Sequence, residues 1–192
     1  MLSRKKIGMI VAGIAVVGMV ILFVQLSAEQ NTQESIPAFL KNGSKPALEE
    51  SAISKTHYVH PNGAFSFAYP EGASVRMVPG EDDGEVLTIE QERGAGMFTA
   101  QVGIQIATTP FDEDSALTPE RIKKDIPDMV MGEVQMIRVD GTQAVAFTST
   151  DASFGASAEV WMVYGGRLYQ ISVPDNSRAL LYNLLTTWTW NR

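Results

Sequence analysis

The stretch that decides the fold is Ala158–Val173, with the sequence AEVWMVYGGRLYQISV. It contains two apolar runs separated by Gly165-Gly166, a two-residue turn signal typical of a tight β-hairpin. Both faces of the first strand are apolar, as its successive residues show: Val160, Trp161, Met162 and Val163. A strand with two apolar faces is expected in the middle of a sheet that is covered on each side.

Other segments repeat with the two-residue period of a strand. Val134–Val139 and Thr142–Thr148 flank a second hairpin signal, Asp140-Gly141, and Phe65–Tyr69 alternates large apolar with small residues. The alternation is most regular in Phe98–Ala107, where one face is apolar and the other carries polar residues and glycine. We expect the apolar face of this strand to meet the core and the polar face to meet water or a partner.

Two helices are also predicted. Thr118 is a residue type preferred at helix N-caps, Pro119 suits the first helical position, and Pro127 ends the segment. A second helix is expected over residues 177–188, where four apolar residues share one face: Leu181, Leu184, Leu185 and Trp188. This face should pack on the sheet, with Leu184 and Leu185 near Trp161 or Ile171. Hairpins without strand–helix–strand repeats predict an α+β fold with a mainly antiparallel sheet.

The N-terminal segment has a different composition. Ile7–Leu26 carries no charge, and a helix of this length spans ~30 Å, the hydrocarbon thickness of a bilayer. Three basic residues precede it (Arg4, Lys5 and Lys6), and the next basic residue is Lys41. This asymmetry predicts a cytoplasmic N-terminus at residues 1–6, a transmembrane helix at 7–26, and the rest of the chain in the extracellular or periplasmic space. The alternative is a signal peptide cleaved after Ala28, although Leu26-Ser27-Ala28 is a poor cleavage site.

The remaining chain divides into a linker and a domain. Residues 27–55 are polar and contain Pro37, Pro46 and the turn signal Asn42-Gly43, so they are interpreted as a flexible tether, with one short helix over 47–53. Residues 56–192 hold the predicted strands and helices. The formal net charge of −7 argues against nucleic acid as a partner. The absence of cysteine excludes thiol nucleophiles, thiolate metal sites and disulfides.

The order of features in the domain resembles the PsbP-like (Mog1/PsbP-type) family. The resemblance begins with Tyr58–Pro70, continues through the long amphipathic strand, the Pro-capped helix and the Val139–Ala144 hairpin, and ends with Gly166–Ile171 and the final helix. It covers about residues 56–192. It implies a central antiparallel sheet covered by helices on both faces, an α/β/α sandwich, and a non-enzymatic role. None of the functional residues of the founding members matches a position here.

No catalytic, metal or cofactor signature is recognised. His57 and His60 are three residues apart, which on a strand places them on opposite sides, so both are interpreted as surface or turn residues. No Gly-x-Ser-x-Gly elbow is present, and Gly94-Ala95-Gly96 is interpreted as a turn, because it lacks the glycine spacing of a nucleotide loop. The acidic clusters Glu81–Glu85 and Asp112–Asp114 lack the alternating spacing of a calcium loop.

Aromatic residues offer the one candidate binding surface. Trp161 and Trp188 are expected in the core from their periodicity, whereas Trp190 lies beyond the helical stripe and is expected to be exposed, with Tyr164 as a second candidate. The function expected from the sequence is a membrane-tethered, extracytoplasmic, non-catalytic binding or scaffolding domain. The alternatives are an accessory subunit of a membrane complex, with a protein partner in the envelope, or a secreted carrier after signal cleavage.

Overall fold

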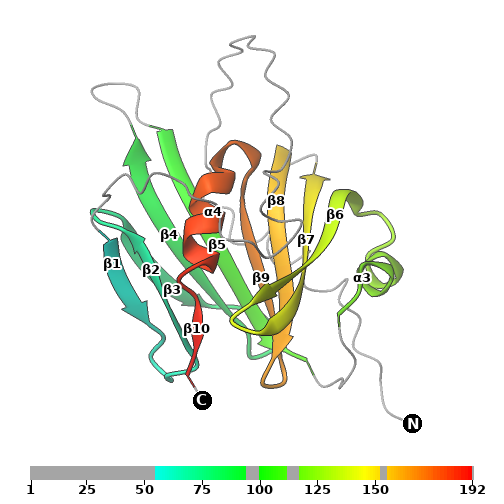
Figure 1. The fold of residues 1–192 in the computed structure, drawn as a ribbon, viewed down its shortest axis with the longest axis horizontal. Coiled ribbons are helices and arrows are strands. Elements are labelled where there is room, and N and C mark those ends of the chain that lie inside the picture. Colours follow the sequence, from blue (N-terminus) through cyan, green and yellow to red (C-terminus); the bar gives the residue numbers. More distant parts are fainter. Residues whose placement is uncertain (1–54, 94–99, 112–116, 152–154, 192) are drawn as a thin grey trace.

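The computed structural model describes residues 55–93, 100–111, 117–151 and 155–191. Its centre is a seven-stranded antiparallel sheet with the strand order β3-β4-β5-β9-β8-β7-β6 (Figure 1). The strands are β3 (Ser74–Pro79), β4 (Glu85–Arg93), β5 (Ala100–Pro110), β6 (Val130–Val139), β7 (Thr142–Asp151), β8 (Gly155–Tyr164) and β9 (Arg167–Pro174). A second sheet has the order β1-β2-β10 and is formed by β1 (Lys55–Val59), β2 (Phe65–Pro70) and β10 (Thr189–Trp190).

The predicted hairpins are confirmed. The β6–β7 hairpin turns at Asp140 and Gly141, and the β8–β9 hairpin turns at Gly165 and Gly166. All four turn residues have positive φ angles (43°, 81°, 57° and 73°), the backbone that Asp-Gly and Gly-Gly pairs adopt most readily. The hairpin from β8 to β9 places β8 inside the sheet between β9 and β7, as its two apolar faces predict.

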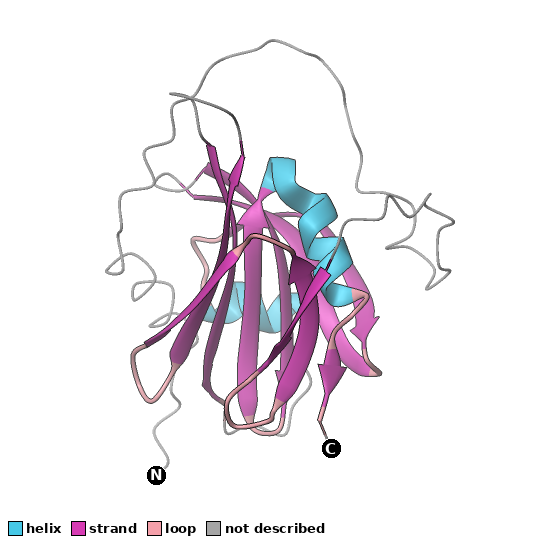
Figure 2. Ribbon diagram, turned by 90° about the vertical axis from the view of Figure 1, so that its left-hand side faces the viewer, coloured by secondary structure: helices cyan, strands magenta, loops and turns pink. Residues whose placement is uncertain are grey.

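The helices are short. Helix α3 (Pro119–Asp125) starts where predicted, because the Thr118 hydroxyl accepts a hydrogen bond from the backbone N–H of Arg121 at 3.2 Å. A 3-10 turn, η1 (Asp175–Ser177), leads into α4 (Arg178–Leu185), which lies across one face of the large sheet (Figure 1). Figure 2 shows how strongly strands dominate the molecule.

Each face of the large sheet has its own core. The α4 side also packs against the small sheet, and its buried residues come from α4 and from β2, β4, β5, β6, β7, β8, β9 and β10. Five of them are nearly inaccessible: Phe67, Ile106, Met162, Ile171 and Leu184. The opposite face, called the α3 side below, has a smaller core made of Phe111, Leu117, Ile122, Ile126, Val145, Phe147, Trp161 and Leu168. The smaller core covers the half of the sheet formed by β7, β8 and the start of β9.

The predicted α/β/α sandwich is wrong. Instead of helical layers, the α4 side is covered by one eight-residue helix together with a three-stranded sheet, and α3 has seven residues. The C-terminal helix stops at Leu185 because the chain is then held by β2: the Thr187 hydroxyl accepts a hydrogen bond from the Ala68 N–H at 2.9 Å. Trp188 leaves the helix and stacks on Phe65 with ring centroids 4.5 Å apart.

Across the described residues, no helix is both long and apolar enough to cross a membrane. The predicted transmembrane segment at residues 7–26, the linker helix at 47–53, the turn at Gly94–Gly96 and the acidic cluster Asp112–Asp114 all lie outside the described residues.

Candidate functional site

Polar side chains form a line across the α3 side of the large sheet. Thr88 on β4 is paired with Gln105 on β5, Gln105 with Ser172 on β9, and Ser172 with Glu159 on β8. Directly paired residues point to the same face of a sheet, so these four side chains lie in one row. All four residues are half-buried. We call Thr88, Gln105, Ser172 and Glu159 the polar row.

The row begins at an exposed edge and ends next to the smaller core. On the edge strand β3, Arg76 is paired with Thr88, and its guanidinium lies 3.6 Å from the Glu90 carboxylate. At the other end, Glu159 is paired with Phe147 on β7, and Trp161 lies two residues further along β8 on the same face. Both aromatic residues are buried in the smaller core. The row therefore leads from the sheet edge to a carboxyl group beside apolar side chains.

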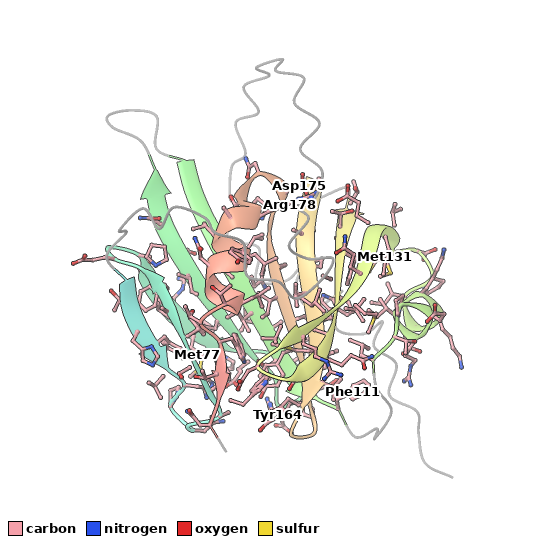
Figure 3. All side chains as sticks on the ribbon, in the orientation of Figure 1. Met77, Phe111, Met131, Tyr164, Asp175 and Arg178 are labelled. Atoms are coloured by element: carbon pink, nitrogen blue, oxygen red, sulfur yellow. The ribbon has the colours of Figure 1, made fainter. Side chains whose placement is uncertain are left out.

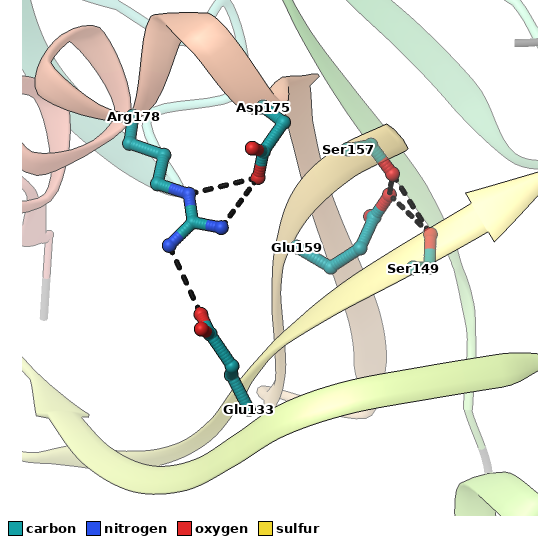
Figure 4. A network of polar contacts seen from close by, with 6 residues as sticks. All are labelled: Glu133, Ser149, Ser157, Glu159, Asp175 and Arg178. Atoms are coloured by element: carbon teal, nitrogen blue, oxygen red, sulfur yellow. Dashed lines mark hydrogen bonds and ion pairs between the residues drawn. The ribbon is translucent and has the colours of Figure 1, made fainter. Parts of the chain in front are cut away.

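Three hydrogen-bond donors surround the Glu159 carboxyl group, and two of them, Ser149 and Ser157, are drawn in Figure 4. Ser157 Oγ donates to Glu159 Oε1 at 2.6 Å, and Ser149 Oγ lies 3.4 Å from the same oxygen. The Trp161 indole N–H donates to Glu159 Oε2 at 3.2 Å. The two hydroxyls are also 2.8 Å apart, which links β7 to β8 through side chains as well as through the backbone ladder.

Burial raises the pKa of the Glu159 carboxyl group to about 7. The hydrogen bonds from Ser157, Trp161 and Ser149 lower its pKa, but they only partly offset the loss of hydration. No basic group is among these hydrogen-bond partners. Glu159 consequently carries its proton for much of the time at neutral pH and can act as either a hydrogen-bond donor or an acceptor.

Gln170 lies next to this cluster on β9 and is 3% exposed. It is paired with Trp161 on β8 and with Ala107 on β5, which places its side chain on the α3 side, diagonal to Glu159. Neither its amide oxygen nor its amide nitrogen has a hydrogen-bond partner. Leaving a buried polar group unpaired costs roughly 1–3 kcal/mol, so a further hydrogen-bonding group at this amide would stabilise the protein.

The cluster around Glu159 consists of hydrogen-bonding groups. The groups bonded to Glu159 are two serine hydroxyls and an indole, so they include no second titratable group that would complete an acid–base pair. In the part of the chain that the structure describes, no group of three His, Asp or Glu side chains could hold a metal ion. The cluster instead supplies donors and acceptors at fixed positions.

A second polar contact joins the small sheet to the large one. Of the predicted surface or turn positions, His57 occupies an exposed one, whereas His60 is 4% exposed and begins the turn after β1, where its carbonyl oxygen accepts a hydrogen bond from the Gly63 N–H at 2.8 Å. His60 Nδ1 lies 2.5 Å from Asn62 Oδ1, and Nε2 lies 3.0 Å from Glu85 Oε1, an ion-pair distance without hydrogen-bond alignment. Burial, and to a lesser extent the Glu85 charge, raise the pKa of Tyr58. The contact fixes the start of β4 against the turn after β1.

Tyr164 and Trp190, the candidate surface from the sequence, are brought together but do not form an open surface. Their rings stack with centroids 4.1 Å apart, and Tyr164 lies at the end of β8 near the hairpin (Figure 3). Trp190 is 5% exposed, so its predicted exposure is wrong. The reason is β10: pairing with Phe65 on β2 directs Trp190 into the aromatic core. Trp161 and Trp188 are buried as predicted.

Comparison with known proteins adds no assignment. No protein-family model matches the sequence, and no curated protein is significantly similar to it. The resemblance to PsbP-like domains therefore stays a prediction, and the functional argument depends on the site itself.

Proposed function

We propose that this chain is a membrane-tethered, extracytoplasmic, non-catalytic binding domain that takes its ligand on the polar row. The tether follows from the uncharged segment Ile7–Leu26 and the basic residues before it. The observation that carries the binding role is Gln170, a buried amide with two unpaired polar atoms beside the row. A ligand that reaches it would supply the missing hydrogen bonds.

The geometry favours binding over catalysis for a specific reason. Catalysis by proton transfer needs an acid or base positioned against a second reacting group, and Glu159 is hydrogen-bonded to two serines and a tryptophan. The row also spreads its polar groups over four strands, β4, β5, β9 and β8, without a concentration of charge at one point. This distribution suits an extended ligand held by several weak contacts.

Two measurements test the proposal. Protease added to intact spheroplasts should digest the domain, whereas protection until lysis would reverse the orientation. Detergent-solubilised full-length protein should then co-sediment with the detergent-insoluble cell-wall fraction of the producing cells. The Gln105→Ala/Ser172→Ala double variant should lose most of this binding. Gln143→Ala should retain it, because Gln143 is an exposed residue of β7 outside the row. Equal sedimentation of all three proteins would contradict a role for the row.

One observation favours the accessory-subunit alternative. Edge strand β6 exposes three apolar side chains, Val130 (64%), Val134 (41%) and Met136 (45%). Exposed apolar residues on an edge strand are typical of sites that pair with another chain. The bulge between Gly132 and Gln135 interrupts this edge, which makes continuous pairing harder. If a Val134→Lys variant no longer co-purifies with a membrane complex while variants of the polar row still do, the accessory-subunit alternative is supported over the proposed binding domain.

A further inference from the structure

We propose that the ligand of the polar row is a neutral, hydroxyl-rich glycan chain that lies across the strands, perpendicular to their direction. This inference rests on the proposed binding function and adds the chemical class of the ligand. It is argued from the spacing of the row, its hydrogen-bonding chemistry, its charge, and the unpaired amide of Gln170.

The spacing of the row separates a glycan from a peptide. The four side chains come from four adjacent strands and repeat at the inter-strand distance of ~4.8 Å. In a β-1,4-linked hexose chain one ring follows the next at close to this distance. Alternate rings are turned over, but each ring carries hydroxyl groups on both edges, so successive rings can meet successive strands. An extended peptide presents same-face side chains only every ~6.8 Å, two residues of ~3.4 Å each, and falls out of register after one strand.

The hydrogen-bonding chemistry points the same way. The hydroxyl of Ser172 and the amide of Gln105 can each donate and accept, and so can the Glu159 carboxyl when protonated. The Thr88 hydroxyl donates to the Arg76 carbonyl oxygen at 3.4 Å and can accept from a ligand. Sugar hydroxyls also donate and accept, so each ring finds a partner whichever way its hydroxyls turn.

Charge selects a neutral chain. Glu159 ends the row, Glu90 lies beside it on β4, and the whole protein has a formal net charge of −7. Glu159 carries its proton for much of the time at neutral pH, and the Glu90 carboxylate is paired with the Arg76 guanidinium. The row therefore has no net positive charge to hold a polyanionic glycan, which the acidic protein as a whole repels.

Gln170 lies beside the buried end of the polar row. It lies two residues before Ser172 on β9, on the same face, with both amide atoms unpaired. Both amide atoms lie beneath the surface, so a hydroxymethyl or hydroxyl group of the ring at Ser172 and Glu159 would pair with this amide after a shift of the side chains above it. Trp161 lies next to Gln170, and its indole N–H is bonded to Glu159, so ligand binding at this end changes the environment of that N–H.

The test uses the full-length protein in lipid nanodiscs with ¹⁵N-labelled tryptophan, titrated with cellohexaose, chitohexaose and hexagalacturonate. The neutral hexamers should shift the Trp161 indole signal, assigned with Trp161→Phe. The signals of Trp188 and Trp190, which lie in the other core, should stay in place. Gln105→Ala and Ser172→Ala should each weaken binding by about tenfold, and Gln143→Ala should not. Variants are compared only where their tryptophan spectra match that of the wild type, with Thr88→Ala as the further row variant.

Three outcomes would overturn the inference. They are no shift of the Trp161 signal with either neutral hexamer, shifts that persist unchanged in the row variants, and stronger binding of the galacturonate chain. Failure here is distinguishable from failure of the proposed function. If the hexamers do not bind but wall co-sedimentation still depends on Gln105 and Ser172, the row binds a ligand that is not a neutral glycan. If neither measurement depends on these residues, the row is not a binding site.

Discussion

Replacing Glu159 by Gln should make the protein more stable at pH 8 and should remove a fall in stability between pH 4.5 and 7. The glutamine amide has almost the shape of the carboxyl group and can keep hydrogen bonds to Ser157 and Trp161, but it does not ionise. The wild-type carboxyl has an ordinary pKa of 4.5 and a pKa of about 7 in the folded protein. The substitution therefore separates the effect of the buried charge from the effect of shape.

The direction and the size of this change in stability follow from proton linkage. Between the two pKa values the folded protein holds a proton that the unfolded chain has released, so rising pH favours unfolding. The stability supplied by Glu159 is fully present below pH 4.5 and is lost as the pH rises to about 7. A difference of about 2.5 pKa units, at ~1.4 kcal/mol each, gives a loss of about 3 kcal/mol. This is a large share of the ~5–15 kcal/mol that stabilises a typical domain.

The assay is urea unfolding of wild type and Glu159→Gln at pH 5, 6, 7 and 8, because titration of all other groups cancels in the difference between the two proteins. From pH 5 to pH 8, the free energy of unfolding of the variant should rise relative to that of the wild type by up to about 3 kcal/mol. Glu90→Gln is the matched control, since it removes one negative charge from the neighbouring, half-exposed part of the same face. A difference that is flat with pH, or that moves in favour of the wild type, would refute the argument that Glu159 is buried without a compensating cation.

Three further predictions concern stability and tyrosine ionisation. Leu184→Ala should lower the free energy of unfolding by about 2–5 kcal/mol, because Leu184 is 1% exposed in the larger core, whereas exposed Asn183→Ala should change little in the same urea titration. Thr118→Ala should cost about 0.5–2 kcal/mol through loss of the N-cap of α3, and an unchanged unfolding midpoint would contradict this. Glu85→Gln should lower the pKa of Tyr58 in an absorbance titration but not restore its ordinary value, because burial is the larger cause.

The sequence was sufficient for elements whose conformation is set by neighbours in the chain. The hairpin at Asp140-Gly141 and the start of α3 at Thr118 depend on residues within a few positions, and both were predicted correctly. The burial of Leu184 was also predicted, since helical period alone places it on the apolar face. Two neighbours were expected for Leu184. Ile171 belongs to the same core, as predicted, whereas Trp161 lies on the other face of the sheet.

Features set by contacts between distant segments were missed. Trp190 is buried because β10 pairs with β2, a contact between residues more than a hundred positions apart that no local pattern encodes. The end of α4 has the same origin, since the Thr187 hydroxyl is held by β2. The polar alternation of the segment containing Gln105 did predict a face that meets water or a partner, but not the strands that would lie beside it.

The polar row could not be predicted from the sequence, although one of its members carried a signal. Three members of the row, Thr88, Gln105 and Ser172, are ordinary polar residues in strands where polar and apolar positions alternate. Only the order of the strands in the sheet brings them into line. Glu159 is different, because it is a charged residue followed by positions that are apolar on both faces of the strand. This pattern places its carboxyl group against a covered part of the sheet. A buried carboxyl without a paired base must be protonated, hydrogen-bonded, or completed by a ligand. The structure supplies the hydrogen bonds of Ser157 and Trp161 to Glu159 but leaves Gln170 beside them unpaired, and this combination makes the row a better candidate for binding than the aromatic residues that the sequence favoured.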